Sequence, residues 1–293
     1  MKKKISFGTI LILILLALLM RGVKQNETVQ EEAKPSAPIS ESGDLRVHYI
    51  DVEQGDSIFI QLPNGETMLI DAGENDMGET VCDYIGAQGD TKIDYLVGTH
   101  PHSDHIGGLD TVIEAFDIGT LYLPDVSHDT KTFMDVVETA KVKGVKAEKA
   151  KAGVEVLKTE NLAVQFLSPV SAEYEEMNDY SAVVSVTYGN NRFLFMGDAE
   201  YTVENQLKGS IGVYDVLKVG HHGSNSSSTA NFLEQVQPKY AVISCGTDNK
   251  YGHPTQQVLS RLERFGCEIF RTDEQGNVVA ISDGSEIHFE TER

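Results

Sequence analysis

The sequence predicts an α/β fold in which two mixed β-sheets pack together with helices on both outer faces, a four-layer αββα sandwich. Strand-like runs occur in clusters, and single helical patterns separate those clusters. The strand-like run at residues 93–100 contains a continuous apolar stretch, as in a strand that is buried on both faces. The chain has 293 residues, of which 40% are hydrophobic and 24% are charged, and this composition excludes a coiled coil or a polytopic membrane protein.

The elements follow in order along the chain. Early strands are predicted at residues 45–52, 56–62, 67–72 and 93–100, with a turn at 63–65. A helix is predicted from Asp104 to Phe116. Later strands are predicted at residues 163–169, 181–189, 191–198, 214–220, 239–246 and 277–282, and further helices at 130–143, 199–208, 228–236 and 254–265.

Residues 1–24 are predicted to be a targeting segment. Three lysines precede an apolar run from Ile5 to Met20, which Arg21 ends. The run is long for a cleaved signal peptide and no small-residue cleavage site follows it, so an uncleaved membrane anchor is favoured over a removed signal. The lysines would stay in the cytoplasm, which places the rest of the chain on the extracellular side, either anchored or secreted.

Residues 25–43 are polar and predict a disordered linker, and residues 44–293 predict one domain. The first 24 residues hold five of the 24 basic residues and none of the 45 acidic ones, so the remainder carries 19 against 45, or −26. This acidity argues against a broad basic surface for non-specific nucleic-acid binding. Three cysteines are too few for a disulfide scaffold.

The strongest motif is THPHSDHIGG at residues 99–108, where a predicted strand ends and a helix begins. His100 and His102 can point to one side of an extended loop, and Asp104 and His105 open the helix. Four ligand-type side chains in six residues indicate a cation site, and imidazole with carboxylate suits zinc, manganese or iron. The glycines at 107–108 would let the start of the helix approach the sheet closely.

Further metal donors follow other predicted strands. Asp198 comes at the end of an apolar strand and could bridge two cations with its two oxygens. His221 and His222 lie between glycines, and one could complete a metal site while the other binds substrate or acts as a general acid. His253 is a candidate ligand for a second metal.

Other polar residues leave two interpretations open. Asp71 could orient the histidine loop from behind the ligands, or simply form a turn before a glycine. Ser226–Ser228 could bind anionic oxygens or cap the next helix. Asp51, Gln54 and Asp56 are expected to line the same face. The remaining histidines, at positions 48, 128 and 288, have no partner in the sequence and are interpreted as ordinary surface or core residues.

Together these motifs resemble the metallo-β-lactamase superfamily, and within it the hydrolase domain of ComEC-type competence proteins and their stand-alone relatives. The matching stretches are DVEQGDS (51–57), LIDAG (69–73), the His100–His105 motif, MGD (196–198), LKVGHHGS (217–224) and YGHP (251–254). Two departures stand out. Glu53 replaces a glycine usual in the family, and residues 178–181 (NDYS) stand where the third-motif histidine is usual. The resemblance then favours His222, with His221 second, as the replacement ligand.

The resemblance implies a hydrolase domain at residues 44–293 with two divalent metal ions, zinc or alternatively manganese. One metal would be held by His100, His102 and His222 and the other by Asp104, His105 and His253, with Asp198 and a hydroxide between them. Asp104, Asp198 and His221 are expected to take part in catalysis. Bound water would reach a pKa near ~7 and act as the nucleophile.

Phosphoester and phosphodiester substrates are favoured because two cations complement an anionic centre. DNA, as the substrate of an extracellular nuclease, and a phosphate-bearing wall or choline polymer both fit, and no protein partner is evident. A β-lactamase fits less well because the third-motif histidine is missing. A second hypothesis is a metal-stabilised binding module at the cell surface without turnover. A third is a redox protein with a di-iron site.

Overall fold

The structure, a computed structural model, describes residues 43–293. The predicted targeting segment and all but the last residue of the predicted linker lie outside the described residues. Within residues 43–293, no helix combines the length and apolar character that a membrane span requires.

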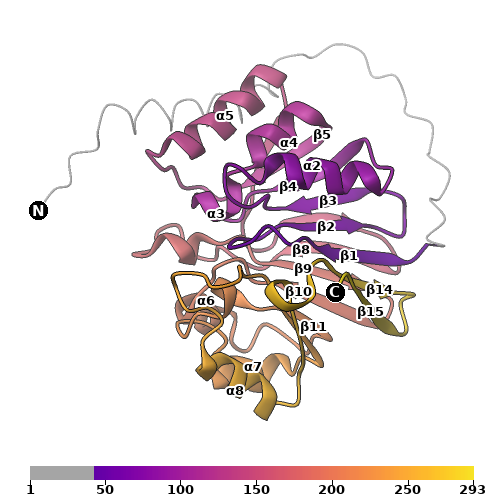
Figure 1. Ribbon diagram of the computed structural model, residues 1–293, viewed down its shortest axis with the longest axis vertical. Helices are drawn as coiled ribbons and strands as arrows, with labels where there is room; N and C mark the ends of the chain where they lie inside the picture. Colours follow the sequence, from indigo (N-terminus) through magenta and orange to yellow (C-terminus); the bar gives the residue numbers. More distant parts are fainter. Residues whose placement is uncertain (1–42) are drawn as a thin grey trace, which may run out of the picture.

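Two mixed β-sheets pack face to face and helices cover both outer sides, which confirms the predicted αββα architecture (Figure 1). The first sheet has the order β15-β14-β1-β2-β3-β4-β5-β6. Its strands are β1 (Leu45–Tyr49), β2 (Ile58–Gln61), β3 (Thr67–Ile70), β4 (Lys92–Val97), β5 (Asp117–Leu123), β6 (Lys146–Lys149), β14 (Val278–Ser282) and β15 (Ile287–Thr291).

The second sheet has the order β13-β12-β11-β10-β9-β8-β7. Its strands are β7 (Glu155–Lys158), β8 (Leu162–Phe166), β9 (Val184–Tyr188), β10 (Asn191–Phe195), β11 (Val216–Lys218), β12 (Tyr240–Ile243) and β13 (Glu268–Arg271). Each sheet has a parallel half and an antiparallel half. The parallel half runs from β3 to β6 in the first sheet and from β10 to β13 in the second.

Helices flank each sheet, and two short 3-10 helices lie in loops near the site. The helices and turns are α2 (Gly78–Ala87), α3 (Ser103–Ile106), α4 (Leu109–Ala115), α5 (Lys131–Lys143), η1 (Met177–Tyr180), α6 (Tyr201–Leu207), η2 (Gly220–Gly223), α7 (Ala230–Val236), α8 (Gln256–Arg264) and α9 (Thr272–Gln275). The helices α2, α4 and α5 cover the first sheet, and α6, α7 and α8 cover the second (Figure 1).

The alternation of side chains along each strand builds three apolar layers. In β10, Phe193 and Phe195 enter the core between the sheets, while Leu194 points outward to the helices of the second sheet. This follows from the two-residue period of a strand, which sends successive side chains to opposite faces. Full burial of one such side chain stabilises the fold by about 1.5–3 kcal/mol.

The predicted helix from Asp104 to Phe116 is instead two helices, α3 and α4, separated at residues 107–108. A side chain at Gly107 would place its Cβ 2.3 Å from the backbone nitrogen of Asn75, so only glycine allows this close approach. The backbone of this segment also bonds to the β3–α2 loop, where the Ala72 N–H donates to the His105 carbonyl at 2.7 Å. The segment therefore packs tightly against the sheet, as predicted, at the expense of a continuous helix.

Several elements were not predicted: α2, α9, β5, β6, β7, β13 and β15. Of these strands, β6, β7, β13 and β15 are the four edge strands of the two sheets, and their residues are largely exposed or half-buried, so their sequences lack the apolar signal of the central strands. They extend both sheets outward without changing the arrangement of the layers.

Candidate metal centre

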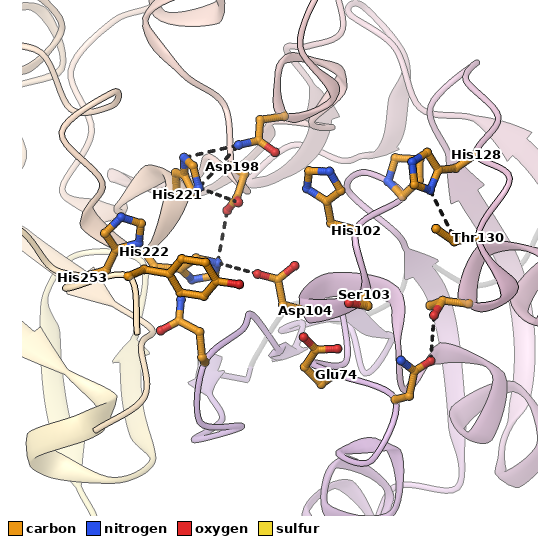
Figure 2. A pocket seen from close by; sticks show the side chains of 16 residues that line it. Glu74, His102, Ser103, Asp104, His128, Thr130, Asp198, His221, His222 and His253 are labelled. Atoms are coloured by element: carbon orange, nitrogen blue, oxygen red, sulfur yellow. Dashed lines mark hydrogen bonds and ion pairs between the residues drawn. The ribbon is translucent and has the colours of Figure 1, made fainter. Parts of the chain in front are cut away.

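The loops that follow parallel strands carry the predicted site residues. Asp71 follows β3, the His100–His105 segment follows β4, Asp198 follows β10, His221 and His222 follow β11, and His253 follows β12. Carboxyl ends of neighbouring parallel strands meet at one sheet edge, which is where ligands bind in such sheets. The loops enclose a cavity of about 480 Å³, and Figure 2 shows its labelled side chains converging from both sheets.

Asp198 lies at the centre of this arrangement, with one carboxylate oxygen toward each side. Its Oδ1 lies 3.0 Å from His105 Nε2 and 3.4 Å from His222 Nε2. Its Oδ2 lies 3.6 Å from His221 Nε2 and 4.0 Å from His100 Nε2. Burial by itself would raise the pKa of the Asp198 carboxyl, but the charges of His105 and His222 outweigh burial and hold this pKa well below its usual range.

The backbone fixes where Asp198 points. The preceding Gly197 has φ 54°, and a Cβ there would come within 3.1 Å of the Thr99 side chain. The Asp198 N–H donates to Ser181 Oγ at 3.0 Å. The carboxylate is therefore held by the chain itself among the four imidazoles.

The deepest part of the site contains polar atoms whose hydrogen-bonding capacity is unmet. One ligand atom each from Asp104, His105, Asp198 and His222 lie within 4.8 Å of one another. Although Asp198 Oδ1 approaches both ring nitrogens, it has no well-aligned hydrogen-bond partner, and neither has His105 Nε2 or His222 Nε2. Buried polar atoms are ordinarily satisfied, and a divalent cation among these four side chains would satisfy them with the nitrogen and oxygen ligands that zinc takes.

The other nitrogen of each buried histidine is already occupied. His105 Nδ1 lies 2.8 Å from Asp71 Oδ2, and His222 Nδ1 donates to the Ser244 carbonyl at 3.0 Å. Asp71 also accepts bonds from the Thr99 N–H at 2.8 Å and the Thr99 hydroxyl at 2.6 Å. A hydrogen on Nδ1 leaves the Nε2 lone pair free to bind metal. The geometry thus agrees with the orienting role considered for Asp71.

A buried ion pair lies beneath His222. Lys218 is fully buried, and its Nζ lies 2.7 and 2.8 Å from the two carboxylate oxygens of Asp56. Asp56 Oδ1 in turn lies 3.3 Å from His222 Nδ1. Burial by itself would raise the pKa of Asp56, but Lys218 and His222 outweigh burial and lower it to about 2. This pair connects the β1–β2 loop of the first sheet to β11 of the second.

The other side of Asp198 is more open. His100 is buried, and its Nε2 lies 3.0 Å from Nδ1 of the partly exposed His102. Burial and the charge of His105 hold the pKa of His100 well below its usual range, so the ring is neutral. The His221 side chain is 24% exposed and lies on the same Oδ2 side of Asp198. Two partly exposed imidazoles and one buried one therefore face the second half of the site.

The structure groups the candidate ligands differently from the predicted division between two metals. His222, which was grouped with His100 and His102, lies with Asp104 and His105. His253, which was grouped with Asp104 and His105, lies beside His221, with ring centroids 5.4 Å apart. In η2, His221 and His222 both have positive φ, 48° and 52°, and their ring centroids lie 6.2 Å apart with the ring planes at 70° to each other.

The family comparison agrees with this geometry. Residues 50–247 match the metallo-beta-lactamase superfamily. The chain belongs to this superfamily. Its members are metal-dependent hydrolases, and the convergence of histidines and carboxylates described above is consistent with a metal site.

Two curated proteins and one solved structure show how this superfamily member relates to others. It is 32% identical to ComE operon protein 3 of Bacillus subtilis (strain 168), covering 81% of this chain and 33% of that protein. The chain is 30% identical to Recombination protein 2 of Haemophilus influenzae, over 80% of this chain and 28% of that protein. The chain thus spans about a third of the length of these relatives, and the ComEC-type resemblance is confirmed. The YhfI structure from Bacillus subtilis aligns with a TM-score of 0.57 at 12% identity, over 82% of this chain and 100% of that one, and so shows the shared fold.

Residues 178–181, where the resemblance to this superfamily predicts a histidine, lie close to His221. Asn178 lies in η1, and its Nδ2 lies 3.3 Å from His221 Nδ1 and 3.2 Å from Glu200 Oε1. An amide thus stands beside His221 at the site where the sequence lacks the expected histidine. Neither this contact nor Glu200 was predicted, because the sequence separation from Asn178 to His221 is 43 residues.

The structure also resolves the open interpretations around the site. The Ser228 and Thr229 N–H groups donate to the Glu204 carboxylate, and Thr229 caps α7, so this end of the serine run is structural. Ser226 faces the site and donates to Glu200 Oε1 at 3.0 Å. Gln54 lines the cavity.

Two predictions about single residues were wrong. His128, interpreted as an ordinary histidine, lines the cavity, and its ring centroid lies 6.3 Å from that of His102 (Figure 2). Asp51, expected on the same face, instead pairs with Arg293 at 2.7 Å. The β5–α5 loop that carries His128 follows a strand that was not predicted, so its approach to the site had no signal in the sequence.

Proposed function

We propose that this chain is a dinuclear metal hydrolase that cleaves phosphoester or phosphodiester bonds. The observation that carries the proposal is Asp198, a buried carboxylate with two imidazole nitrogens toward each of its oxygens. Such a residue is suited to lie between two cations, as two-metal sites require. Asp104, His105 and His222 would hold one metal, and His100, His102 and His221 lie toward the other.

The charge of the deepest side chains supports a pair of divalent ions. Asp56, Asp71, Asp104 and Asp198 contribute four negative charges, and Lys218 is the cation bound among them. Buried charges are strongly unfavourable unless they are paired. Two divalent cations together with one hydroxide would balance the remaining three negative charges.

When bound, the two ions would lower the pKa of a water toward ~7 and stabilise negative charge on the attacked phosphoryl group. The residues of the chain orient this chemistry. Asp71 and Ser244 hold the outer nitrogens of His105 and His222, so that their Nε2 atoms face inward. His253 lines the same cavity, and burial together with the charges of His221 and His222 lowers its pKa to about 4. A neutral His253 can donate a hydrogen bond to a substrate oxygen.

We further propose that the domain acts outside the cytoplasm on DNA or on a phosphate-bearing wall or choline polymer. The N-terminal basic and apolar segment supports this location, and the similarity to a recombination protein and a competence protein supports DNA as a substrate. Protease digestion of intact cells, compared with lysed cells, tests the location. Protection of the domain in intact cells would contradict it.

Hydrolysis by the full-length purified chain tests the reaction. The protein is stripped of metal, reloaded with Zn²⁺ or Mn²⁺, and assayed with bis(p-nitrophenyl) phosphate, a DNA oligonucleotide and a phosphocholine ester. We expect turnover by the loaded protein and by the matched control His288→Gln, whose histidine lies on β15, and loss of turnover in His105→Ala. Failure of the loaded protein to cleave any of these esters with either metal would contradict the proposal. Binding without turnover would favour the binding-module hypothesis.

A further inference from the structure

Glu200 is a carboxylate beside the site that the proposed mechanism has not yet used. It precedes α6 at the N-cap position, two residues after Asp198, but its side chain does not cap that helix. Instead Oε1 accepts hydrogen bonds from three segments of the chain. The donors are His221 Nδ1 at 3.0 Å, Ser226 Oγ at 3.0 Å and Asn178 Nδ2 at 3.2 Å.

These contacts determine how the His221 ring faces the cavity. The backbone of His221 is left-handed, with φ 48° and ψ 47°, which projects the ring away from that of His222. With Nδ1 turned to Glu200, Nε2 points to Asp198 Oδ2 at 3.6 Å. If Nδ1 carries the hydrogen, the lone pair of Nε2 is available on the open side of the centre.

His105 and His222, like His221, each have an acceptor oxygen next to Nδ1. Asp71 holds His105, the Ser244 carbonyl holds His222, and Glu200 holds His221. The first two holders are buried, whereas the Glu200 side chain is 16% exposed. A carboxylate in this position both orients the ring and increases the basicity of the ligating nitrogen.

We propose that Glu200 is a positioning residue that holds the His221 imidazole on the open side of the centre. Nε2 of His221 then supplies the nitrogen that the third-motif histidine would otherwise give, and Asn178 fills the space where that histidine is missing. This inference rests on the proposed dinuclear site. It assigns Glu200 no contact with the substrate, since the residue acts through His221.

Metal binding by variants of the full-length chain tests the inference without relying on turnover. Wild type, Glu200→Ala and Glu200→Gln are titrated with Co²⁺ in competition with a chelator, and the visible spectrum is followed along with metal content. We expect Glu200→Ala to weaken one of the two metal sites by about 10–100-fold, the usual effect of losing such an outer partner. Glu200→Gln should retain most of the affinity, because its amide oxygen can still accept the Nδ1 hydrogen.

A control and a double variant separate positioning from general stability. Glu204→Gln, on the same helix, removes a carboxylate that bonds only to the Ser228 and Thr229 segment. It should lower Tm without changing either metal affinity or the Co²⁺ spectrum. The double variant Glu200→Ala/His221→Gln should lose no more metal affinity than His221→Gln alone, because Glu200 acts through His221 and both changes remove the same interaction.

Two outcomes would overturn the inference: Glu200→Ala with both metal affinities as in wild type, or a Glu204→Gln variant whose metal affinity falls equally. A protein that binds two metals but hydrolyses no ester would contradict the proposed function alone. The metal titrations would in that case still test Glu200.

Discussion

The two halves of the site on either side of Asp198 differ in how firmly the chain holds them. In the buried half, His105 and His222 are fully enclosed, and their outer nitrogens contact the buried Asp71 and Ser244. In the open half, His102 and His221 are partly exposed, and the His221 ring is held by the partly exposed Glu200. For the proposed two-metal site, we therefore expect the buried half to be preorganised for its metal and the open half to adjust when metal and substrate bind.

The ion pair beneath the buried half offers the strongest way to disrupt this asymmetry. Lys218→Met would leave Asp56 buried without its partner, which typically costs about 3–5 kcal/mol. Urea unfolding should show this loss, and Asp56→Asn/Lys218→Met should recover much of it. The matched control Lys239→Met breaks an exposed pair with Asp215 and should cost at most about 1 kcal/mol. Equal losses in the two lysine variants would show that the buried half does not depend on the pair.

Replacement of the residue that joins the halves should abolish most activity. Asp198→Asn removes the charge that faces four histidines, and we expect hydrolysis to fall on the order of 10²–10³-fold, as when one electrostatic group is lost from a reacting centre. Metal content should fall at both sites. Asp215→Asn, far from the cavity, serves as control. A variant that lost only one metal would show that Asp198 belongs to one half.

Loss of an outer partner should weaken the buried half selectively. The Thr99 N–H, the Thr99 hydroxyl and His105 all direct donors at Asp71. In Asp71→Asn, an amide nitrogen replaces one acceptor oxygen, so at least one of these donors loses its acceptor. We expect one metal site to weaken by about 10–100-fold. Chelator competition measures the effect, and unchanged affinities would show that His105 is positioned without Asp71.

When metal is absent, the stability that His222 and His253 contribute should also depend on pH in opposite directions. Burial lowers the pKa of His222, but Asp198, Asp104 and Asp56 outweigh burial and raise it to about 9 from 6.5. The stability from this proton is therefore fully present below pH 6.5 and is lost as pH rises through about 9. His253, whose pKa is lowered to about 4, contributes in the opposite sense, because its stabilising effect is lost as pH falls toward 4.

Thermal unfolding of the metal-free protein checks this prediction. Between pH 6.5 and 9 we expect Tm to fall on the order of 10 °C, since this pKa shift is worth about 3 kcal/mol and each kcal/mol moves Tm by roughly 2–4 °C in a domain of this size. The metal affinity of the buried half should rise over the same interval, because the metal displaces the proton. His222→Gln should weaken both trends, and part of each should remain because the pKa of His105 is also raised, by Asp198 and Asp71 against burial. A His222→Gln variant with the pH dependence of wild type would contradict the assignment.

The smallest effect is expected at the rim of the open half. His128→Ala removes a ring that lines the cavity and lies 6.3 Å from the His102 ring, and that is not among the proposed metal ligands. The loss of one hydrogen bond to substrate is worth about 0.5–1.5 kcal/mol, so KM should rise roughly 2–10-fold with metal content unchanged. A loss of metal would instead place His128 among the ligands.

How much of this site could be predicted depends on where each residue lies in the chain. The His100–His105 motif and Asp198 each follow an apolar strand, and the ends of parallel strands meet at one edge, so their convergence could be predicted. The sequence could not show that His222 lies with Asp104 and His105, because the direction of its ring depends on the left-handed backbone of η2. The pairing of Lys218 could not be predicted from the sequence, since its partner Asp56 is 162 positions away.

The sequence by itself determined the layers, the superfamily resemblance and the set of ligand-type side chains, because strand periodicity and residues clustered in short motifs are local properties. The tertiary structure alone decided which oxygen of Asp198 each histidine faces, and that Asp56, Asp71 and Glu200 support those rings. These relations join residues from different sheets, and they depend on backbone angles and burial that arise only when the two sheets pack together.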